Sequence, residues 1–133
     1  MDDNRPTVLI ADDNDKMVEV ICRLLATDYQ LAKVVSDGAA ALNYVLGSEP
    51  DFAILDISMP EMDGICVARG IQQARRRTCV VFVTTIEDKD CVREARLVGH
   101  GYVLKRRLSL DLLDAVRGAR DGDFFRSDQS DLR

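Results

Sequence analysis

Acidic side chains crowd the segment LIADDND (residues 9–15), in which an apolar run leads directly into Asp12, Asp13 and Asp15. Ionised carboxylates a few ångströms apart raise one another's pKa unless a cation joins them. Carboxylate oxygens are the hard ligands that Mg²⁺ prefers, and this ion normally keeps several waters when a protein binds it. The segment therefore indicates a metal site, with room for a further oxygen ligand.

Three more polar residues stand directly after apolar runs. Asp56 follows FAIL (52–55), Thr84 follows VVFV (80–83) and Lys105 follows YVL (102–104). A metal held by two or three protein oxygens leaves room for a phosphoryl oxygen, and a lysine binds phosphate as a point charge. Phosphoryl transfer needs little beyond alignment and charge stabilisation. Each residue alone also fits a helix cap, a strand end or a surface charge, so the repeated position is what indicates a site.

The apolar runs have the character of buried parallel strands, because most are rich in β-branched or aromatic residues and lack polar alternation. They are TVLIA (7–11), LAKVV (31–35), FAIL (52–55), VVFV (80–83) and YVL (102–104). Stretches of helical length separate them. The clearest, 15–27, carries an apolar stripe; Gly47 and Gly99 are expected to end the second and fourth helices, and Ser109 to cap the fifth.

Strict alternation of five strands and helices predicts a parallel sheet with helices on both faces. The C-terminal ends of all its strands then lie at one edge, where open α/β sheets bind ligands. This fold brings together five side chains that are distant in sequence, namely Asp12, Asp13, Asp56, Thr84 and Lys105.

Composition limits the other classes of function. The chain has 133 residues and a formal net charge of −5, which argues against general affinity for nucleic acid. No apolar run approaches the ~20 residues of a membrane span, and the first residues do not form a signal peptide. The four cysteines fit no zinc pattern, and the lone His100 suits a loop position better than metal binding. Residues 121–133 lack periodicity and are expected to be a tail or truncated linker after a domain of residues 1–120.

From residue 7 to about 120 the chain resembles the receiver domain of two-component response regulators. LDISMPEMDG (55–64) is similar to the family's signature D-x-x-M-P-x-M-D-G, and ADDND, VTT and GYVLK match its acidic pair, hydroxyl and lysine. The end of the chain resembles the NarL/FixJ-like branch of this CheY-like superfamily. The resemblance implies a flavodoxin-like (βα)5 three-layer sandwich with a five-stranded parallel sheet of order 2-1-3-4-5.

The resemblance also implies roles for the acidic residues. Asp56 would be the phosphoacceptor that attacks a phosphohistidine of a sensor histidine kinase or phosphotransfer protein. Asp13, Asp56 and the backbone carbonyl of Ser58 would bind Mg²⁺ directly, and Asp12 largely through water. The product would be a switch with only self-phosphorylation and slow autodephosphorylation, rather than a turnover enzyme. A cytoplasmic location and a homodimer formed on phosphorylation would accompany this role.

The switch residues implied by the resemblance are Thr84, Lys105 and Tyr102. Thr84 and Lys105 would contact the phosphoryl oxygens, and Tyr102 would turn inward as Thr84 moves. Phosphorylation adds nearly two negative charges. The two residues would be drawn toward that charge, which biases a surface formed by the fourth helix, fifth strand and fifth helix.

Some positions depart from the family pattern or shape its loop. Arg106 stands where proline is common, and a cis bond before a non-proline residue costs ~2.5–4 kcal/mol, so a trans bond is expected. Thr85 is larger than the usual alanine or glycine and is expected to narrow access to the phosphoryl group. Pro60, Asp63 and Gly64 would shape the loop, Gly64 through a backbone conformation that other residues adopt with difficulty.

Other readings of the motifs fit less well. A phosphatase of the haloacid dehalogenase type needs a second aspartate two residues after the nucleophile, where this chain has Ser58. A dinucleotide-binding domain needs a glycine-rich turn where this chain has DDND. A receiver that serves only as a docking module, without regulation by phosphorylation, remains the alternative. NarL-like receivers usually precede a DNA-binding domain; the residues after 120 are too few for one, so the sequence leaves open whether the chain is excised or stands alone.

Overall fold

The computed structural model describes residues 3–127, which form five α-helices and a parallel sheet of six strands. The strands are β1 (Thr7–Ala11), β2 (Gln30–Val35), β3 (Phe52–Leu55), β4 (Cys79–Thr84), β5 (Gly101–Leu104) and β6 (Phe125–Arg126). The helices are α1 (Asp15–Leu25), α2 (Gly38–Ser48), α3 (Gly64–Gln73), α4 (Lys89–Val98) and α5 (Leu108–Asp121), with a short 3-10 helix η1 (Lys105–Arg107) before α5.

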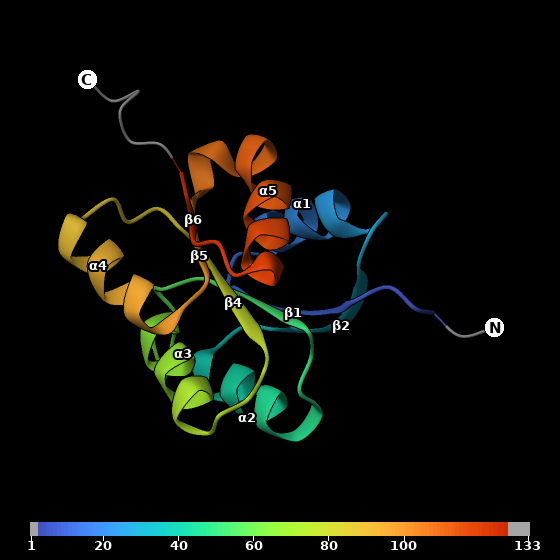
Figure 1. Ribbon diagram of the computed structural model, residues 1–133, viewed down its shortest axis with the longest axis horizontal. Coiled ribbons are helices and arrows are strands. Elements are labelled where there is room, and N and C mark those ends of the chain that lie inside the picture. Colours follow the sequence, from blue (N-terminus) through green and yellow to red (C-terminus); the bar gives the residue numbers. More distant parts are fainter. Residues whose placement is uncertain (1–2, 128–133) are drawn as a thin grey trace.

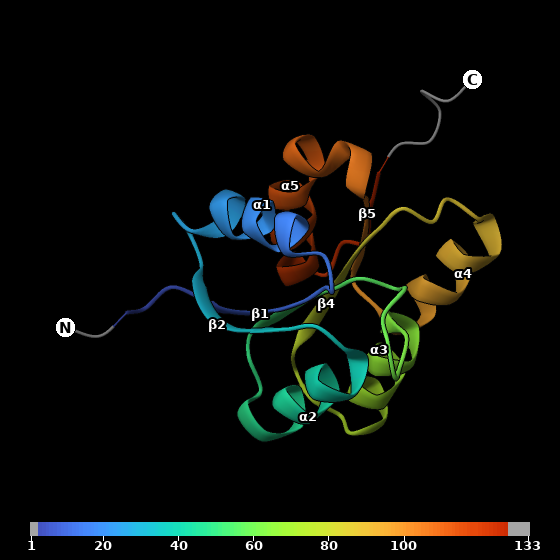
Figure 2. The same ribbon diagram turned by 180° about the vertical axis from the view of Figure 1, so that it is seen from behind.

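Helices cover both faces of the sheet. Helices α1 and α5 lie together on one face, and α2, α3 and α4 lie on the other (Figures 1 and 2). Each face has its own buried apolar cluster, built largely from alternate residues of the same strands. No helix within residues 3–127 is both long and apolar enough to span a bilayer. The predicted three-layer α/β fold is confirmed.

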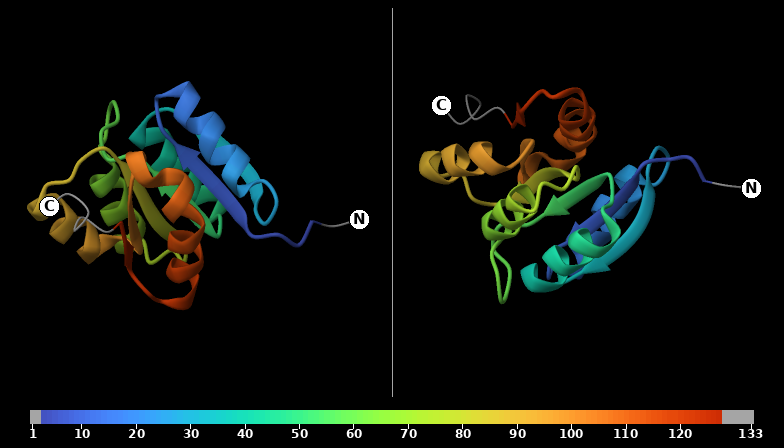
Figure 3. Two further views of the ribbon diagram at one scale, coloured as in Figure 1. Left: turned by 90° about the horizontal axis from the view of Figure 1, so that it is seen from above. Right: turned by 60° about the horizontal axis from the view of Figure 1, so that its bottom comes forward.

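The strand order is β2-β1-β3-β4-β5-β6, which confirms the expected order 2-1-3-4-5 and adds a sixth strand beyond β5. Strand β6 pairs in parallel with β5, so that Phe125 lies beside Gly101 and Arg126 beside Tyr102. It belongs to the segment expected to be a tail or linker, and Figure 3 shows it between α4 and α5. The remainder of that segment, residues 128–133, lies outside the described residues.

Polar side chains cap the N-termini of four helices, and Asp88 caps α4 by accepting from the Asp90 N–H. Asn14, Asp37 and Asp63 accept hydrogen bonds from the backbone N–H groups of Met17, Ala40 and Cys66, at 3.1, 2.7 and 2.8 Å. Such caps satisfy donors that the first helical turn leaves unpaired. These caps set where α1, α2, α3 and α4 begin after the loops that precede them.

The predicted helix ends are only partly right. Gly99 does cap the end of α4, but α2 continues through Gly47 to Ser48, and its C-cap is Glu49, whose φ of 45° is left-handed. Ser109 does not cap α5, because η1 leads directly into that helix and Ser109 lies within it. The end of α2 and the start of α5 were therefore predicted wrongly. The backbone conformation of the neighbouring residues, and not the type of one residue, decides where these helices begin and end.

Candidate functional site

The adjacent ends of β1 and β3 bring three carboxylates together. Asp12 and Asp13 follow β1, and Asp56 follows β3, in a register that places Ala11 beside Leu55. The Asp56 N–H donates to the carbonyl of Ala11 at 2.9 Å and so extends the ladder into the site. One carboxylate oxygen from each aspartate lies within 4.8 Å of the others. The structure thus assembles the acidic cluster from two neighbouring strands.

Lys105 reaches across this cluster from the end of β5. Its Nζ donates to Oδ2 of Asp56 at 3.1 Å and forms an ion pair with Oδ2 of Asp12 at 3.0 Å. Burial alone would lower the pKa of Lys105, but the two carboxylates outweigh burial and raise it. Lys105 is therefore a cation held between two of the three carboxylates of the cluster.

The carboxylate of Asp56 is nearly buried, with 6% of the residue exposed. Burial raises the pKa of Asp56, and the charge of Asp12 adds to this, while the contact with Lys105 opposes both. The other carboxylate oxygen, Oδ1, accepts from the N–H of Ser58 at 3.3 Å on the loop after β3. An aspartate in this setting is held in one orientation, with its charge only partly compensated.

The donor set fits a hard divalent cation. Three carboxylates face one ammonium, so the cluster keeps an excess of negative charge. Oδ2 of Asp12 is buried and accepts no hydrogen bond, although it contacts the Lys105 ammonium. Asp13 is exposed and leaves one side of the cluster open. Oxygen ligands with an open side are what Mg²⁺ requires when it keeps several waters.

Gly64 packs against the backbone of the phosphoacceptor candidate. The expectation of an unusual backbone conformation is wrong, because among the described glycines only Gly122 has a positive φ. A Cβ at Gly64 would instead lie 2.3 Å from the carbonyl oxygen of Asp56 and 3.0 Å from the Cα of Ile57. The Gly64 N–H also donates to the carbonyl of Ile57 at 2.8 Å. Glycine is needed here because the start of α3 lies against the Asp56 loop.

Thr84 and Tyr102 meet at one residue, Ile86, in the loop between β4 and α4. The Thr84 hydroxyl oxygen accepts from the Ile86 N–H at 3.2 Å, and the Tyr102 hydroxyl donates to the Ile86 carbonyl at 2.7 Å. Thr84 and Tyr102 are each 1% exposed. The side chain of Tyr102 therefore lies inside the molecule, and the loop is attached to both β4 and β5. The sequence carried no signal for this role of Ile86, because only its backbone takes part.

The chain after Lys105 differs from a proline-containing loop. No cis peptide bond occurs in residues 3–127, which confirms the expected trans bond before Arg106. Residues Lys105–Arg107 form η1, and Arg106 pairs with Glu87 at 3.2 Å on the surface. Thr85 is exposed at the start of the β4–α4 loop. Neither Arg106 nor Thr85 is among the residues that form the acidic cluster and its ion pairs.

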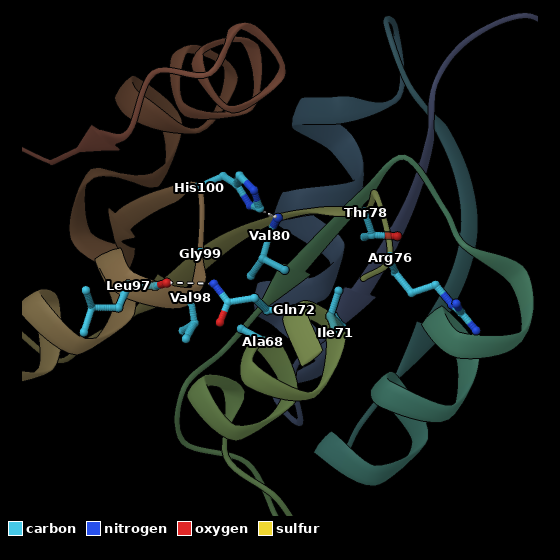
Figure 4. Close-up of a pocket in the computed structure, with 10 residues that line it drawn as sticks. All are labelled: Ala68, Ile71, Gln72, Arg76, Thr78, Val80, Leu97, Val98, Gly99 and His100. Carbon is cyan, nitrogen blue, oxygen red and sulfur yellow. Dashed lines mark hydrogen bonds between the residues drawn. The ribbon is translucent and has the colours of Figure 1, made fainter. Parts of the chain in front are cut away.

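A hollow of about 170 Å³ lies at the other end of β4, away from the acidic cluster (Figure 4). The polar groups that line this hollow form hydrogen bonds between neighbouring helices, loops and strands. Gln72 of α3 donates to the Leu97 carbonyl of α4 at 3.0 Å, and Nδ1 of His100 accepts from the Val80 N–H at 2.9 Å. His100 lies between α4 and β5, as expected for a loop position, and links that loop to the start of β4.

Comparisons with known proteins agree with this geometry. The family model of the response regulator receiver domain matches residues 8–117. The transcriptional regulatory proteins YxjL of Bacillus subtilis and NarL of Mycobacterium tuberculosis are each 30% identical, over 92% and 86% of this chain and 58% and 55% of their own lengths. The chain thus spans little more than half of these relatives. The receiver domain structure of Mycobacterium tuberculosis NarL is similar with a TM-score of 0.78 and 28% identity, over 87% of this chain and 99% of that one. This chain therefore belongs to the response regulator receiver domains of two-component systems, a family whose standard function is switching by phosphorylation.

Proposed function

We propose that this chain receives a phosphoryl group on Asp56, in a Mg²⁺-dependent transfer from a phosphohistidine of a sensor histidine kinase or phosphotransfer protein. The observation that carries this proposal is the pair of contacts from Lys105 to the two buried carboxylates of the cluster, those of Asp12 and Asp56, at 3.0 and 3.1 Å. An ion pair on the surface needs only one carboxylate for its ammonium, and neither group has to be buried. A site that binds a dianionic phosphoryl group does need such a cation.

Asp12, Asp13, Asp56 and the backbone carbonyl of Ser58 would hold Mg²⁺, which supplies charge neutralisation for the cluster and for the transferred group. Asp56 attacks phosphorus with one carboxylate oxygen, an oxygen–phosphorus bond forms, and the phosphorus–nitrogen bond to the donor histidine breaks. The histidine nitrogen takes the bond's electron pair. Because Asp56 is held by Ser58 and Lys105, it meets the donor in one orientation.

Lys105 and Thr84 respond to the new charge. Phosphorylation places further oxygens beside Lys105, which exchanges its contact with Oδ2 of Asp56 for a phosphoryl oxygen. The Thr84 hydroxyl now accepts from Ile86 and can donate its proton to a second phosphoryl oxygen. Movement of Thr84 changes the Ile86 loop to which Tyr102 is bound, so the surface of α4, β5 and α5 changes with it.

The wider setting follows from the family. Partners would be a histidine kinase or phosphotransfer protein and, on phosphorylation, a second copy of this chain. The location would be cytoplasmic. The chemistry is self-phosphorylation and slow autodephosphorylation rather than turnover of a free substrate. Direct binding of nucleic acid is not assigned to this chain, whose relatives are transcriptional regulators of nearly twice the matched length.

Phosphorylation by acetyl phosphate tests the proposal against the docking-only alternative. With Mg²⁺, intact-mass spectrometry of the wild-type protein should show one added phosphoryl group, which chelation of Mg²⁺ abolishes. Asp56→Asn should gain none, whereas the control Asp114→Asn, which neutralises an exposed carboxylate of α5, should label like wild type. A wild-type protein that gains no mass would support the docking-only module and overturn the proposal.

A further inference from the structure

The segment 123–127 folds back over the edge of the sheet between α4 and α5 (Figures 1 and 3). Its two aromatic residues lie on opposite faces of the sheet, as successive residues of a strand do. Phe124 packs against the apolar cluster on the α2–α3–α4 face, and Phe125 against the cluster on the α1–α5 face. The Phe124 ring also lies 4.9 Å below the guanidinium carbon of Arg96 in α4. We call residues 123–127 the C-terminal strap.

A buried polar network fastens the end of the strap. The hydroxyl of Ser127, a residue only 1% exposed, donates to Oδ2 of Asp111 in α5 at 2.7 Å and accepts from the Leu104 N–H at 3.0 Å. The Ser127 N–H donates to the Tyr102 carbonyl at 2.9 Å, and Arg107 donates to Asp111 at 2.9 Å. A buried hydroxyl that both donates and accepts is costly to leave unpaired, so these contacts specify one seating of the strap.

The hydrogen bonds that hold the strap on β5 are made to Tyr102 and Leu104, the part of this strand that leads into the proposed phosphorylation site. Tyr102 holds the strap with its carbonyl and the Ile86 loop with its hydroxyl. Leu104, which donates to Ser127, directly precedes Lys105, whose Nζ lies in the acidic cluster. One short strand therefore contacts the strap on one side and the switch residues on the other.

We infer that the C-terminal strap is a self-bound cover of the α4–β5–α5 face, seated in the unphosphorylated state and loosened by phosphorylation. This inference rests on the proposed function. The strap is complementary to the arrangement in which Lys105 contacts Asp56 and Thr84 contacts Ile86. When both side chains shift to phosphoryl oxygens, β5 and the start of α4 move relative to α5. Because the strap contacts α4, β5 and α5 together, it cannot keep its contacts with all three when they move relative to one another.

Thermodynamic linkage makes the coupling reciprocal. If phosphorylation weakens the strap, weakening the strap must favour the phosphorylated state. The loss of one buried hydrogen bond, typically worth about 1 kcal/mol, corresponds to about a fivefold change in equilibrium. The expected effects are therefore about fivefold in the opening of the strap, and up to about fivefold in affinity for a phosphoryl mimic.

Hydrogen exchange on the full chain tests the inference, with Mg²⁺ and beryllofluoride as the phosphoryl mimic. The amides of residues 125–127 should exchange about fivefold faster with the mimic than without it. Ser127→Ala should speed their exchange without the mimic and should bind the mimic more tightly. The control Ser48→Ala, at an exposed serine that ends α2, should change neither quantity.

The outcomes separate the strap from the proposed function. If the mimic binds but exchange at 125–127 is unchanged or slower, the strap inference is overturned and the proposed function stands. If Ser127→Ala loosens the segment without tightening binding of the mimic, the coupling is likewise overturned. If the mimic fails to bind and acetyl phosphate adds no mass, the proposed function fails, and the strap inference fails with it.

Discussion

Replacing Lys105 by methionine tests how strongly the acidic cluster depends on its single internal cation. Methionine keeps most of the apolar stem and removes the ammonium. The side chains of Asp12 and Asp56 are 1% and 7% exposed, and that of Lys105 is 13% exposed. Removing one partner of a buried ion pair costs roughly 3–5 kcal/mol, because the remaining charge stays buried and unpaired. Since the site is open at Asp13 and Asp56 can take up a proton, we expect the lower end, about 3 kcal/mol.

Urea unfolding at pH 7 without Mg²⁺ measures this loss. Lys33→Met, at an exposed lysine of β2, is the matched control and should change the unfolding free energy by less than about 0.5 kcal/mol. Mg²⁺ should stabilise Lys105→Met more than wild type, because the ion then replaces the missing cation. A loss for Lys105→Met equal to that of Lys33→Met, with an equal response to Mg²⁺, would refute the electrostatic reasoning.

Three further changes test other parts of the account. Asp56→Asn should be more stable than wild type at neutral pH. Folding raises the pKa of Asp56 above 3.8, so the contribution of Asp56 to stability is fully present at low pH and is lost as the pH rises through its pKa in the folded protein. Denaturation at several pH values should therefore show equal stability of Asp56→Asn and wild type below about pH 3, and a growing advantage of the variant above it. Gly64→Ala should cost about 3 kcal/mol in urea unfolding and slow phosphorylation, because its Cβ meets the Asp56 backbone, whereas Gly47→Ala, which meets nothing within 4 Å, should not destabilise; equal stability of the two variants would contradict the packing. Thr85→Ala should speed phosphorylation by acetyl phosphate, and a time course that matches wild type would show that Thr85 does not restrict access.

Much of the fold and the gathering of the acidic cluster could be predicted from the sequence because both follow from strand ends. Parallel strands put their C-termini at one edge, so Asp12, Asp56 and Lys105 had to meet once the alternation of strands and helices was recognised. The type and order of those elements came from short apolar runs and from the family signature. Contacts made by backbone atoms were not predictable in this way: the role of Ile86 depends on its N–H and carbonyl and not on its side chain.

Strand β6 shows a second limit of sequence reasoning. It has two residues, Phe125 and Arg126, too few for any alternation to indicate a strand. It exists because β5 offers an open edge and because Asp111, more than ten residues earlier, accepts from Ser127. Gly64 was also predicted to be needed, but for an unusual backbone conformation. The actual reason is its close approach to the backbone of Asp56, a tertiary contact that the motif alone does not reveal.

The position of the phosphoryl group is the most direct measurement of the central claim. An aspartyl phosphate is an acyl phosphate, which borohydride reduces to homoserine, whereas a free carboxylate resists this reagent. After treatment with Mg²⁺ and acetyl phosphate followed by borohydride, peptide sequencing by mass spectrometry should show homoserine at position 56 and aspartate at positions 12, 13 and 63. Homoserine at any of those other positions, with aspartate intact at 56, would contradict the assignment of Asp56 as the phosphoacceptor.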